Sequence, residues 1–160
     1  EGKTIAIVGD IFHSRVARSN IFGLQAMGAR VIAAGPGTMC PKQLRGLNVE
    51  IRHGIDDVLN DADAIMMLRI QRERLGPAML STAEEYASIY GFDSGRLRRA
   101  KDSVLVMHPG PINRGVEMMP DVADSAQSVI MEQVTNGIAV RMALLYLHVN
   151  SQDAEQAGAL

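Results

Sequence analysis

Short apolar runs alternate with helical stretches along most of this 160-residue chain, and this alternation constrains the fold more than any other feature. Five runs have the length and the β-branched or apolar character of buried strands. They are residues 4–8, 30–34, 49–52, 64–68 and 104–107. Strands that alternate with helices pair in parallel and need cover on both faces. The pattern therefore predicts an α/β fold, a doubly wound, Rossmann-like parallel sheet of about five strands with helices on both faces.

Signals for helix ends lie between the apolar runs. Ser14 is placed to cap a helix, and Gly28 is placed to end it. The other helices are predicted over residues 56–61, from a Ser81–Glu84 capping box through Tyr90, from an Asp93 cap through Lys101, and over about residues 125–149. This last, long C-terminal helix closes the ordered part, and the polar tail from Ser151 is expected to fray.

Composition limits the class of protein. With 47% hydrophobic residues, the chain can bury one sizeable core, so a single domain is expected. A net charge of -2 with mixed signs gives no general attraction to nucleic acid or to an acidic membrane, and no apolar run approaches the roughly 20 residues that span a bilayer. Cys40 is the only cysteine, which excludes an intrachain disulfide and fits a reducing compartment. The sequence starts with Glu1-Gly2-Lys3-Thr4, which contains neither an initiator Met nor the pattern of a signal peptide. The chain is therefore expected to be a fragment cut at a domain boundary.

Three unusual segments follow apolar runs, at the carboxyl ends of strands, where sheets of this kind bind ligands. These segments are residues 9–18, 69–74 and 108–115. In the first, Arg15 and Arg18 begin a helix, where cations oppose the helix dipole unless an anion binds. In the second, Arg69 directly follows a strand, and Gln71 can add an amide donor. Guanidinium groups bind carboxylates in two-point geometry, so the two segments together suit a dicarboxylate, whereas either alone is equally consistent with solvated surface.

The third segment begins with the turn His108-Pro109-Gly110-Pro111. Because Pro109 and Pro111 lack N–H donors, the turn presents carbonyl oxygens, which suit an NH₂-bearing ligand. A purely structural turn is the alternative. The Gly110–Pro111 bond is a candidate cis peptide, and His108 either donates to a carbonyl or caps the strand.

These segments resemble, in the same order, the aspartate domain of bacterial aspartate transcarbamoylases. The matching stretches are residues 9–20 (GDIFHSRVARSN), 67–74 (MLRIQRER), 107–117 (MHPGPINRGVE) and 123–128 (ADSAQS). The resemblance covers nearly the whole chain. The sister family that uses ornithine carries a His-Cys-Leu-Pro turn, which is absent here, and its basic substrate has little use for two arginine forks. The resemblance therefore favours aspartate.

The resemblance implies a role for each segment. Arg15 and Arg69 are expected to bind the two carboxylates of L-aspartate, with Gln71 as a helper beside Arg69. The turn expected to contact carbamoyl phosphate and the attacking amine consists of Pro109, Gly110 and Pro111. The implied reaction transfers a carbamoyl group from carbamoyl phosphate to the amine of L-aspartate, which gives N-carbamoyl-L-aspartate and phosphate in de novo pyrimidine biosynthesis. No cofactor is expected.

The family's phosphate-binding Ser-Thr-Arg-Thr segment does not occur in these 160 residues. It belongs to an amino-terminal carbamoyl-phosphate domain. Residues 1–160 are therefore expected to form an aspartate-binding domain that is inactive alone. No catalytic residue is assigned within it, and its closing helix is expected to contact the amino-terminal domain. The resemblance further implies a cytoplasmic homotrimer with shared active sites. No metal site is expected, because the four histidines lack metal-ligand spacing.

Two other functions stay open on the sequence. A binding or regulatory module that keeps this fold without catalysis is consistent with the missing phosphate segment, although intact Arg15 and Arg69 argue against decay. A nicotinamide oxidoreductase would need G-x-G-x-x-G after the first strand. Here the second and third glycines of the motif are absent after Gly9. Ile11 and Phe12, which follow it, would obstruct the close approach of a pyrophosphate.

Overall fold

A computed structural model describes residues 1–70 and 82–157 of the chain, and their side chains as far as residue 150. The chain divides into two compact units, Glu1–Ile130 and Met131–Leu160, and each is described by itself.

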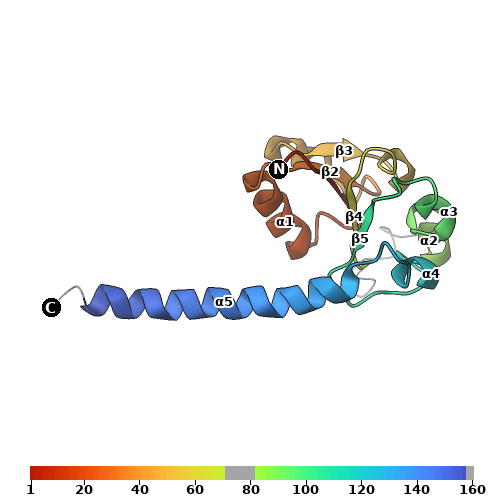
Figure 1. Cartoon of the computed structure of the whole chain (residues 1–160). Coiled ribbons are helices and arrows are strands. Elements are labelled where there is room, and N and C mark those ends of the chain that lie inside the picture. Colours follow the sequence, from red (N-terminus) through yellow and green to blue (C-terminus); the bar gives the residue numbers. More distant parts are fainter. Residues whose placement is uncertain (71–81, 158–160) are drawn as a thin grey trace. The chain divides into compact units, whose positions relative to one another are not determined.

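The first unit is built on a five-stranded, wholly parallel sheet (Figure 1). Its strands are β1 (Thr4–Val8), β2 (Arg30–Ala34), β3 (Glu50–Arg52), β4 (Ala64–Met67) and β5 (Leu105–Met107). Their order in the sheet is β3-β2-β1-β4-β5. The predicted fold class is confirmed, and every strand lies within one residue of a predicted apolar run.

Side chains that alternate along the strands enter different hydrophobic clusters on the two faces of the sheet. Val8 and Met67 belong to one cluster with Phe92. The neighbouring Ile7 belongs to a second cluster with Ile21, which lies on a helix. Since successive residues of a strand point to opposite faces, the two clusters show that the sheet is buried on both sides.

Short helices connect the strands. They are α1 (Arg15–Ala26), α2 (Ala83–Tyr90) and α3 (Ser94–Leu97), with 3-10 helices η1 (Lys42–Leu47) and η2 (Ile55–Asp57), and a further short helix, α4 (Pro120–Ala123), follows the last strand. The predicted limits of α1 are confirmed. The Ser14 hydroxyl accepts the Ala17 N–H at 3.0 Å, and Gly28, with a φ of 76°, follows the last turn.

Several helix predictions were wrong in their limits. The helix predicted over residues 56–61 is only the turn η2. Helix α2 is capped by Thr82, whose hydroxyl accepts the Glu85 N–H at 3.0 Å, and Ser81 lies outside the described residues. Asp93 caps α3 as expected, but this helix ends at Leu97. It does not reach Lys101, whose ammonium instead donates to the Asp61 carbonyl at 2.8 Å.

Helix α4 was missed, although Pro120 at its first position is a recognised start signal. The long helix α5 (Ile130–Ala157) begins later than residue 125. Residues 125–127 form a turn instead, and Ser128 pairs with Val106 of β5: the Val106 N–H donates to the Gln127 carbonyl and the Val129 N–H donates to the Val106 carbonyl. These bonds hold residues 127–129 beside β5.

Helix α5 makes up most of the second unit (Figure 1). It continues through Ser151 to Ala157, beyond its predicted end near residue 149, and fraying of this tail stays a prediction. Among the described residues, no helix has both the length and the apolar character needed to cross a membrane.

Candidate functional site

The strand order places the three predicted ligand segments next to one another. Strands β1, β4 and β5 are neighbours, and because all strands are parallel their carboxyl ends lie along one edge of the sheet. Residues 9–18 follow β1, Arg69 follows β4, and His108 follows β5. The chain order reverses between β1 and β4, which is the point at which open α/β sheets bind ligands. The described parts of the three segments thus lie at one candidate site, here called the carboxyl edge.

Close backbone contacts fix these segments to one another. The Leu68 N–H donates to the Val8 carbonyl at 2.8 Å. Gly9 has a φ of 125°, and a Cβ at this position would lie 3.2 Å from the Leu68 carbonyl oxygen. A side chain at Gly9 would therefore be strained and crowded. The Asn113 side chain donates to the Ile70 carbonyl at 3.0 Å, which ties the third segment to the second.

Arg15 is the first residue of α1, and its side chain is exposed. The first turn of α1 contains no acidic residue, and within the described part of the chain neither Arg15 nor Arg18 forms an ion pair. The backbone N–H groups of a helix start also favour negative charge. This helix start therefore has the electrostatics of an anion site, and Arg15 can add a two-point contact to a carboxylate.

Arg69 is half-buried, two residues beyond the end of β4. It belongs to the same edge as Arg15, as the sequence predicted. Gln71, its expected helper, lies outside the described residues, so its role stays a prediction.

The proline turn lies at the end of β5. Pro109 is half-buried, and Gly110 and Pro111 are exposed, so the turn is open to a ligand. The Gly110–Pro111 peptide is cis, as the sequence indicated. His108 is fully buried under the turn, and its Nδ1 accepts the Gly110 N–H at 2.9 Å.

Buried polar side chains underlie the carboxyl edge. Asp10, His108 and Glu117 are each at most 2% exposed, and Tyr86 is 3% exposed. Burial raises the pKa of the Tyr86 hydroxyl, and the Glu117 carboxylate raises it further, so Tyr86 remains a neutral phenol. A buried charge outside this group, on Arg96, is paired with Asp56 and donates to the Gly91 carbonyl. Because buried polar groups are costly, the concentration of four of them under the ligand segments favours a functional role.

Sequence reasoning assigned no role to Asp10, Tyr86 or Glu117. Asp10 forms a local pair with His13, whose Nδ1 lies 3.0 Å and 3.1 Å from the two carboxylate oxygens. The Asp10 carboxylate also accepts the His13 backbone N–H at 3.2 Å. Asp10 and Glu117 both lie inside stretches that resemble the transcarbamoylases, and this resemblance was the sequence feature that could have identified them as site residues. Their burial, however, depends on how the loops fold back.

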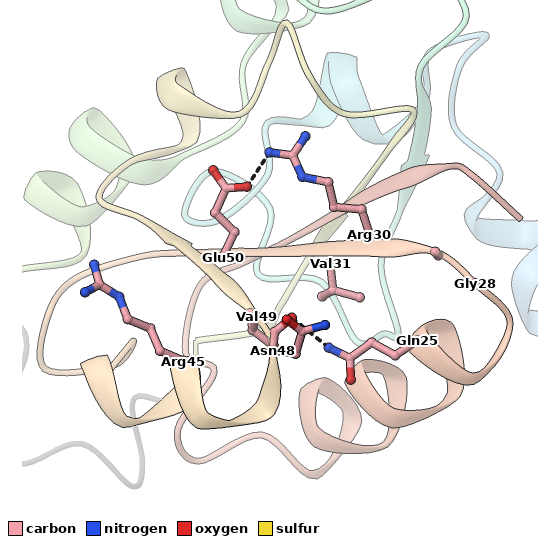
Figure 2. A pocket seen from close by; sticks show the side chains of 9 residues that line it. Gln25, Gly28, Arg30, Val31, Arg45, Asn48, Val49 and Glu50 are labelled. Carbon is pink, nitrogen blue, oxygen red and sulfur yellow. Dashed lines mark hydrogen bonds and ion pairs between the residues drawn. The ribbon is translucent and has the colours of Figure 1, made fainter.

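A hollow of about 590 Å³ lies at the other edge of the sheet, beside the first residues of β2 and β3 (Figure 2). Figure 2 shows Arg30 and Glu50 pointing toward each other across it, and they form an ion pair. Gln25 donates to the Leu47 carbonyl at 2.8 Å. The Arg30 hydrogen bond, assisted by Arg52, lowers the pKa of Glu50 despite its partial burial. Since Arg30 is already paired with Glu50, it is less available to a dicarboxylate than Arg15 at the carboxyl edge.

Fold and site together define a class: parallel α/β domains whose ligand site lies at the carboxyl ends of the strands, across the switch point. Within this class, residues 1–148 match the family described as aspartate/ornithine carbamoyltransferase, Asp/Orn binding domain. The chain belongs to this family. The resemblance inferred from the sequence is thus confirmed.

Individual relatives agree with this assignment. The chain is 54% identical, over 147 residues, to the aspartate carbamoyltransferase catalytic subunit of Syntrophobacter fumaroxidans, in a match that covers 92% of this chain and 48% of the relative. Among solved structures, aspartate transcarbamoylase from Trypanosoma cruzi in complex with phosphate gives a TM-score of 0.75 at 26% identity, covering 91% of this chain and 50% of the other.

Ornithine carbamoyltransferase from Pyrococcus furiosus is similar to nearly the same degree, with a TM-score of 0.74 at 26% identity over 91% of this chain and 49% of the other. The fold alone therefore does not discriminate between the two amino acids. The chain spans about half the length of the relatives that it matches.

Proposed function

We propose that this chain is the aspartate-binding half of an aspartate carbamoyltransferase, the enzyme that transfers a carbamoyl group from carbamoyl phosphate to the amine of L-aspartate. The products are N-carbamoyl-L-aspartate and phosphate. The observation that carries the proposal is the meeting of Arg15, Arg69 and the proline turn at the adjacent ends of β1, β4 and β5.

The proposed mechanism assigns binding and orientation to this half. Arg15 and Arg69 bind the two carboxylates of L-aspartate, so the amine is held in one direction. The carbonyl oxygens of the turn accept N–H groups of the amine and of the carbamoyl NH₂, which brings the nitrogen close to the carbamoyl carbon. A C–N bond forms, the C–O bond to phosphate then breaks in the tetrahedral intermediate, and the attacking nitrogen loses its proton to the departing phosphate. Donors that stabilise its oxyanion would come from the phosphate-binding half.

Electrostatics favour aspartate over ornithine. Both amino acids carry an α-carboxylate, but the ornithine side chain ends in an ammonium group, whereas that of aspartate ends in a second carboxylate. Arg15 and Arg69 would attract the second carboxylate and repel the ammonium group. The relatives matched at about 50% identity are named for aspartate, which supports the same choice.

We also propose that α5 packs against the carbamoyl-phosphate domain that the family resemblance implies. Beyond the buried Ile130, ten large apolar side chains of the helix are between 48% and 77% exposed. They are Met131, Val134, Ile138, Val140, Met142, Leu144, Leu145, Tyr146, Leu147 and Val149. These residues fall on nearly every side of the helix, and a helix that is apolar all round is normally buried.

The remaining parts of the proposal rest on the family resemblance and on composition. We place the complete enzyme in de novo pyrimidine biosynthesis, as a cytoplasmic homotrimer with no nucleic-acid or membrane partner.

The single cysteine, Cys40, is buried, and burial raises the pKa of its thiol to about 11. An inert thiol of this kind is suited to a core rather than to a disulfide or a reactive site.

The test uses an assembled enzyme, defined here as this chain joined to the phosphate-binding half of a relative such as the Syntrophobacter fumaroxidans protein. Transfer of labelled carbamoyl groups to L-aspartate, but not to L-ornithine, is the expected result, and the 160-residue chain alone should be inactive. Preference for ornithine would contradict the proposal. Binding of aspartate without any turnover would indicate a non-catalytic binding module instead.

A further inference from the structure

The buried His108 leads to an inference that rests on the proposed function and extends it to the way in which the proline turn is held. His108 and Glu117 are both fully buried. His108 follows β5 directly, so a rigid strand fixes its backbone. Burial of two titratable side chains is costly unless their contacts are specific.

The contacts of His108 define its tautomer. Nδ1 accepts the Gly110 N–H at 2.9 Å, so this nitrogen carries a lone pair. In the neutral ring the proton is therefore on Nε2, which lies 3.4 Å from Oε1 of Glu117. The carboxylate faces the N–H side of the ring, and this arrangement favours the tautomer that Gly110 needs.

Glu117 is itself held by the loop that follows the turn. Its Oε1 accepts the Asn113 backbone N–H at 2.6 Å. The Asn113 side chain in turn donates to the carbonyl of Ile70, the residue after Arg69. A continuous set of contacts thus connects the proline turn to the end of β4.

The hydrogen bond to Gly110 determines which groups the turn can offer to a ligand. Pro109 and Pro111 have no N–H, so Gly110 carries the one backbone donor of these three residues. That donor points inward to His108. The exposed side of the turn then offers carbonyl oxygens without a competing N–H, which matches the NH₂ of a carbamoyl group and an attacking amine.

We propose that His108 is a positioning residue for the carbamoyl transfer: its Nδ1 holds the Gly110 N–H inward, so that Pro109, Gly110 and Pro111 present only acceptors to the reacting nitrogens. Glu117 supports this role by facing Nε2. His108 does not contact the substrates and acts through the turn.

Two substitutions in the assembled enzyme separate positioning from mere space filling. Both remove the ring, but His108→Asn places an amide oxygen near the position of Nδ1, where it can accept from Gly110. His108→Gln places its amide nearer the position of Nε2, where it can reach Glu117 but not Gly110. The expected kcat of the Gln variant is lower by roughly 10-fold or more, the factor that corresponds to a lost hydrogen bond. The Asn variant should retain most of the kcat.

The KM for L-aspartate should change little in both variants, because Arg15 and Arg69 still bind the carboxylates. Rates are expressed per active site, counted by stoichiometric ligand binding, and thermal unfolding is measured for both variants. The pair His53→Asn and His53→Gln, at an exposed histidine, is the matched control and should leave kcat unchanged. Equal losses of kcat at position 108, or a larger loss in the Asn variant, would overturn the inference.

A second measurement tests the contact without relying on turnover. In the unmodified chain the Gly110 amide should exchange slowly with solvent although Gly110 is exposed, and exchange should become fast in His108→Gln but not in His108→Asn. An unprotected Gly110 amide in the unmodified chain overturns this inference. An inactive assembled enzyme with a protected Gly110 contradicts the proposed function but supports the positioning contact.

Discussion

Arg15 and Arg69, which we propose bind the two carboxylates of one aspartate, have different surroundings. Arg15 is exposed at the start of α1, whereas Arg69 is half-buried beyond β4. An ion pair in a less hydrated setting is stronger, and its loss leaves the partner charge desolvated. The contribution of Arg69 to aspartate binding should therefore exceed that of Arg15.

Replacement of Arg69 by lysine tests this difference. In the assembled enzyme Arg69→Lys keeps the charge but loses the two-point fork, and the lost hydrogen bond to a charged group costs about 1.5–3 kcal/mol. The KM for L-aspartate should rise roughly 10-fold or more. Arg15→Lys should raise it less. Steady-state kinetics with Arg98→Lys as an exposed control measure the effect, and an unchanged KM in Arg69→Lys would contradict the carboxylate assignment.

A second prediction at the residue scale concerns Gly9. Its φ of 125° and its close approach to Leu68 mean that Gly9→Ala should lower the free energy of unfolding by about 1–3 kcal/mol. Gly23→Ala is the matched control, because Gly23 lies within α1 and has free space around it. Alanine there should be neutral or stabilising. Urea unfolding of both variants is the measurement, and equal stabilities would contradict the prediction.

At the scale of elements, Asp63 connects three strands near their amino ends. It precedes β4 and accepts the Thr4 N–H of β1 at 2.8 Å. It also pairs with Lys101, which precedes β5, at 3.0 Å. The Thr4 hydrogen bond, followed by the bond from Lys101, lowers the pKa of the Asp63 carboxyl. The charged form of Asp63 therefore stabilises the folded sheet.

This lowered pKa predicts how stability depends on pH. The stabilisation by Asp63 is fully present above the ordinary value of 3.8 and is lost as the pH falls through the lower pKa of the folded state. Asp63→Asn should therefore destabilise the chain most near neutral pH, and the difference from the unmodified chain should shrink in acid. Denaturation at a series of pH values measures the difference. Asp102→Asn, at an exposed carboxylate, should show no such trend.

Sequence reasoning succeeded where an element depends on its own residues. The five apolar runs, the Ser14 cap and the cis Gly110–Pro111 bond are of this kind. It failed for the start of α5, because residues 127–129 bond to β5, a tertiary contact that overrides helical spacing. The candidate site shows the same limit. The arginines were visible as side-chain types, but the His108–Glu117 pair depends on a loop that folds back over the strand end.

At the scale of the whole molecule, the exposed apolar surface of α5 should affect how the chain behaves when it is separated from the phosphate-binding half. Leu144 and Leu147 are 62% and 63% exposed. Apolar surface of this extent favours association. The proposed packing of α5 against another domain would cover this surface in the assembled enzyme.

We therefore expect the isolated chain to self-associate in a concentration-dependent manner through α5. Replacing Leu144 and Leu147 by glutamine should weaken association more than it lowers the free energy of unfolding, because both side chains are exposed. Sedimentation equilibrium measures the first quantity and urea unfolding the second. Asn136→Ala, at an exposed polar position of the same helix, is the control. A chain that stays monomeric at high concentration would contradict the prediction.

The contact between the turns after β1 and β2 limits how the substrate preference of this scaffold can be redesigned. A Cβ at Gly35 would lie 2.5 Å from the Gly9 carbonyl oxygen, and Gly9 itself has a backbone conformation that other residues rarely adopt. Neither position offers room for a new recognition group. A designer who wants the carboxyl edge to accept a different amino acid has to diversify the loops beyond these two glycines, for example at residue 15 or residue 69, and leave the glycine pair unchanged.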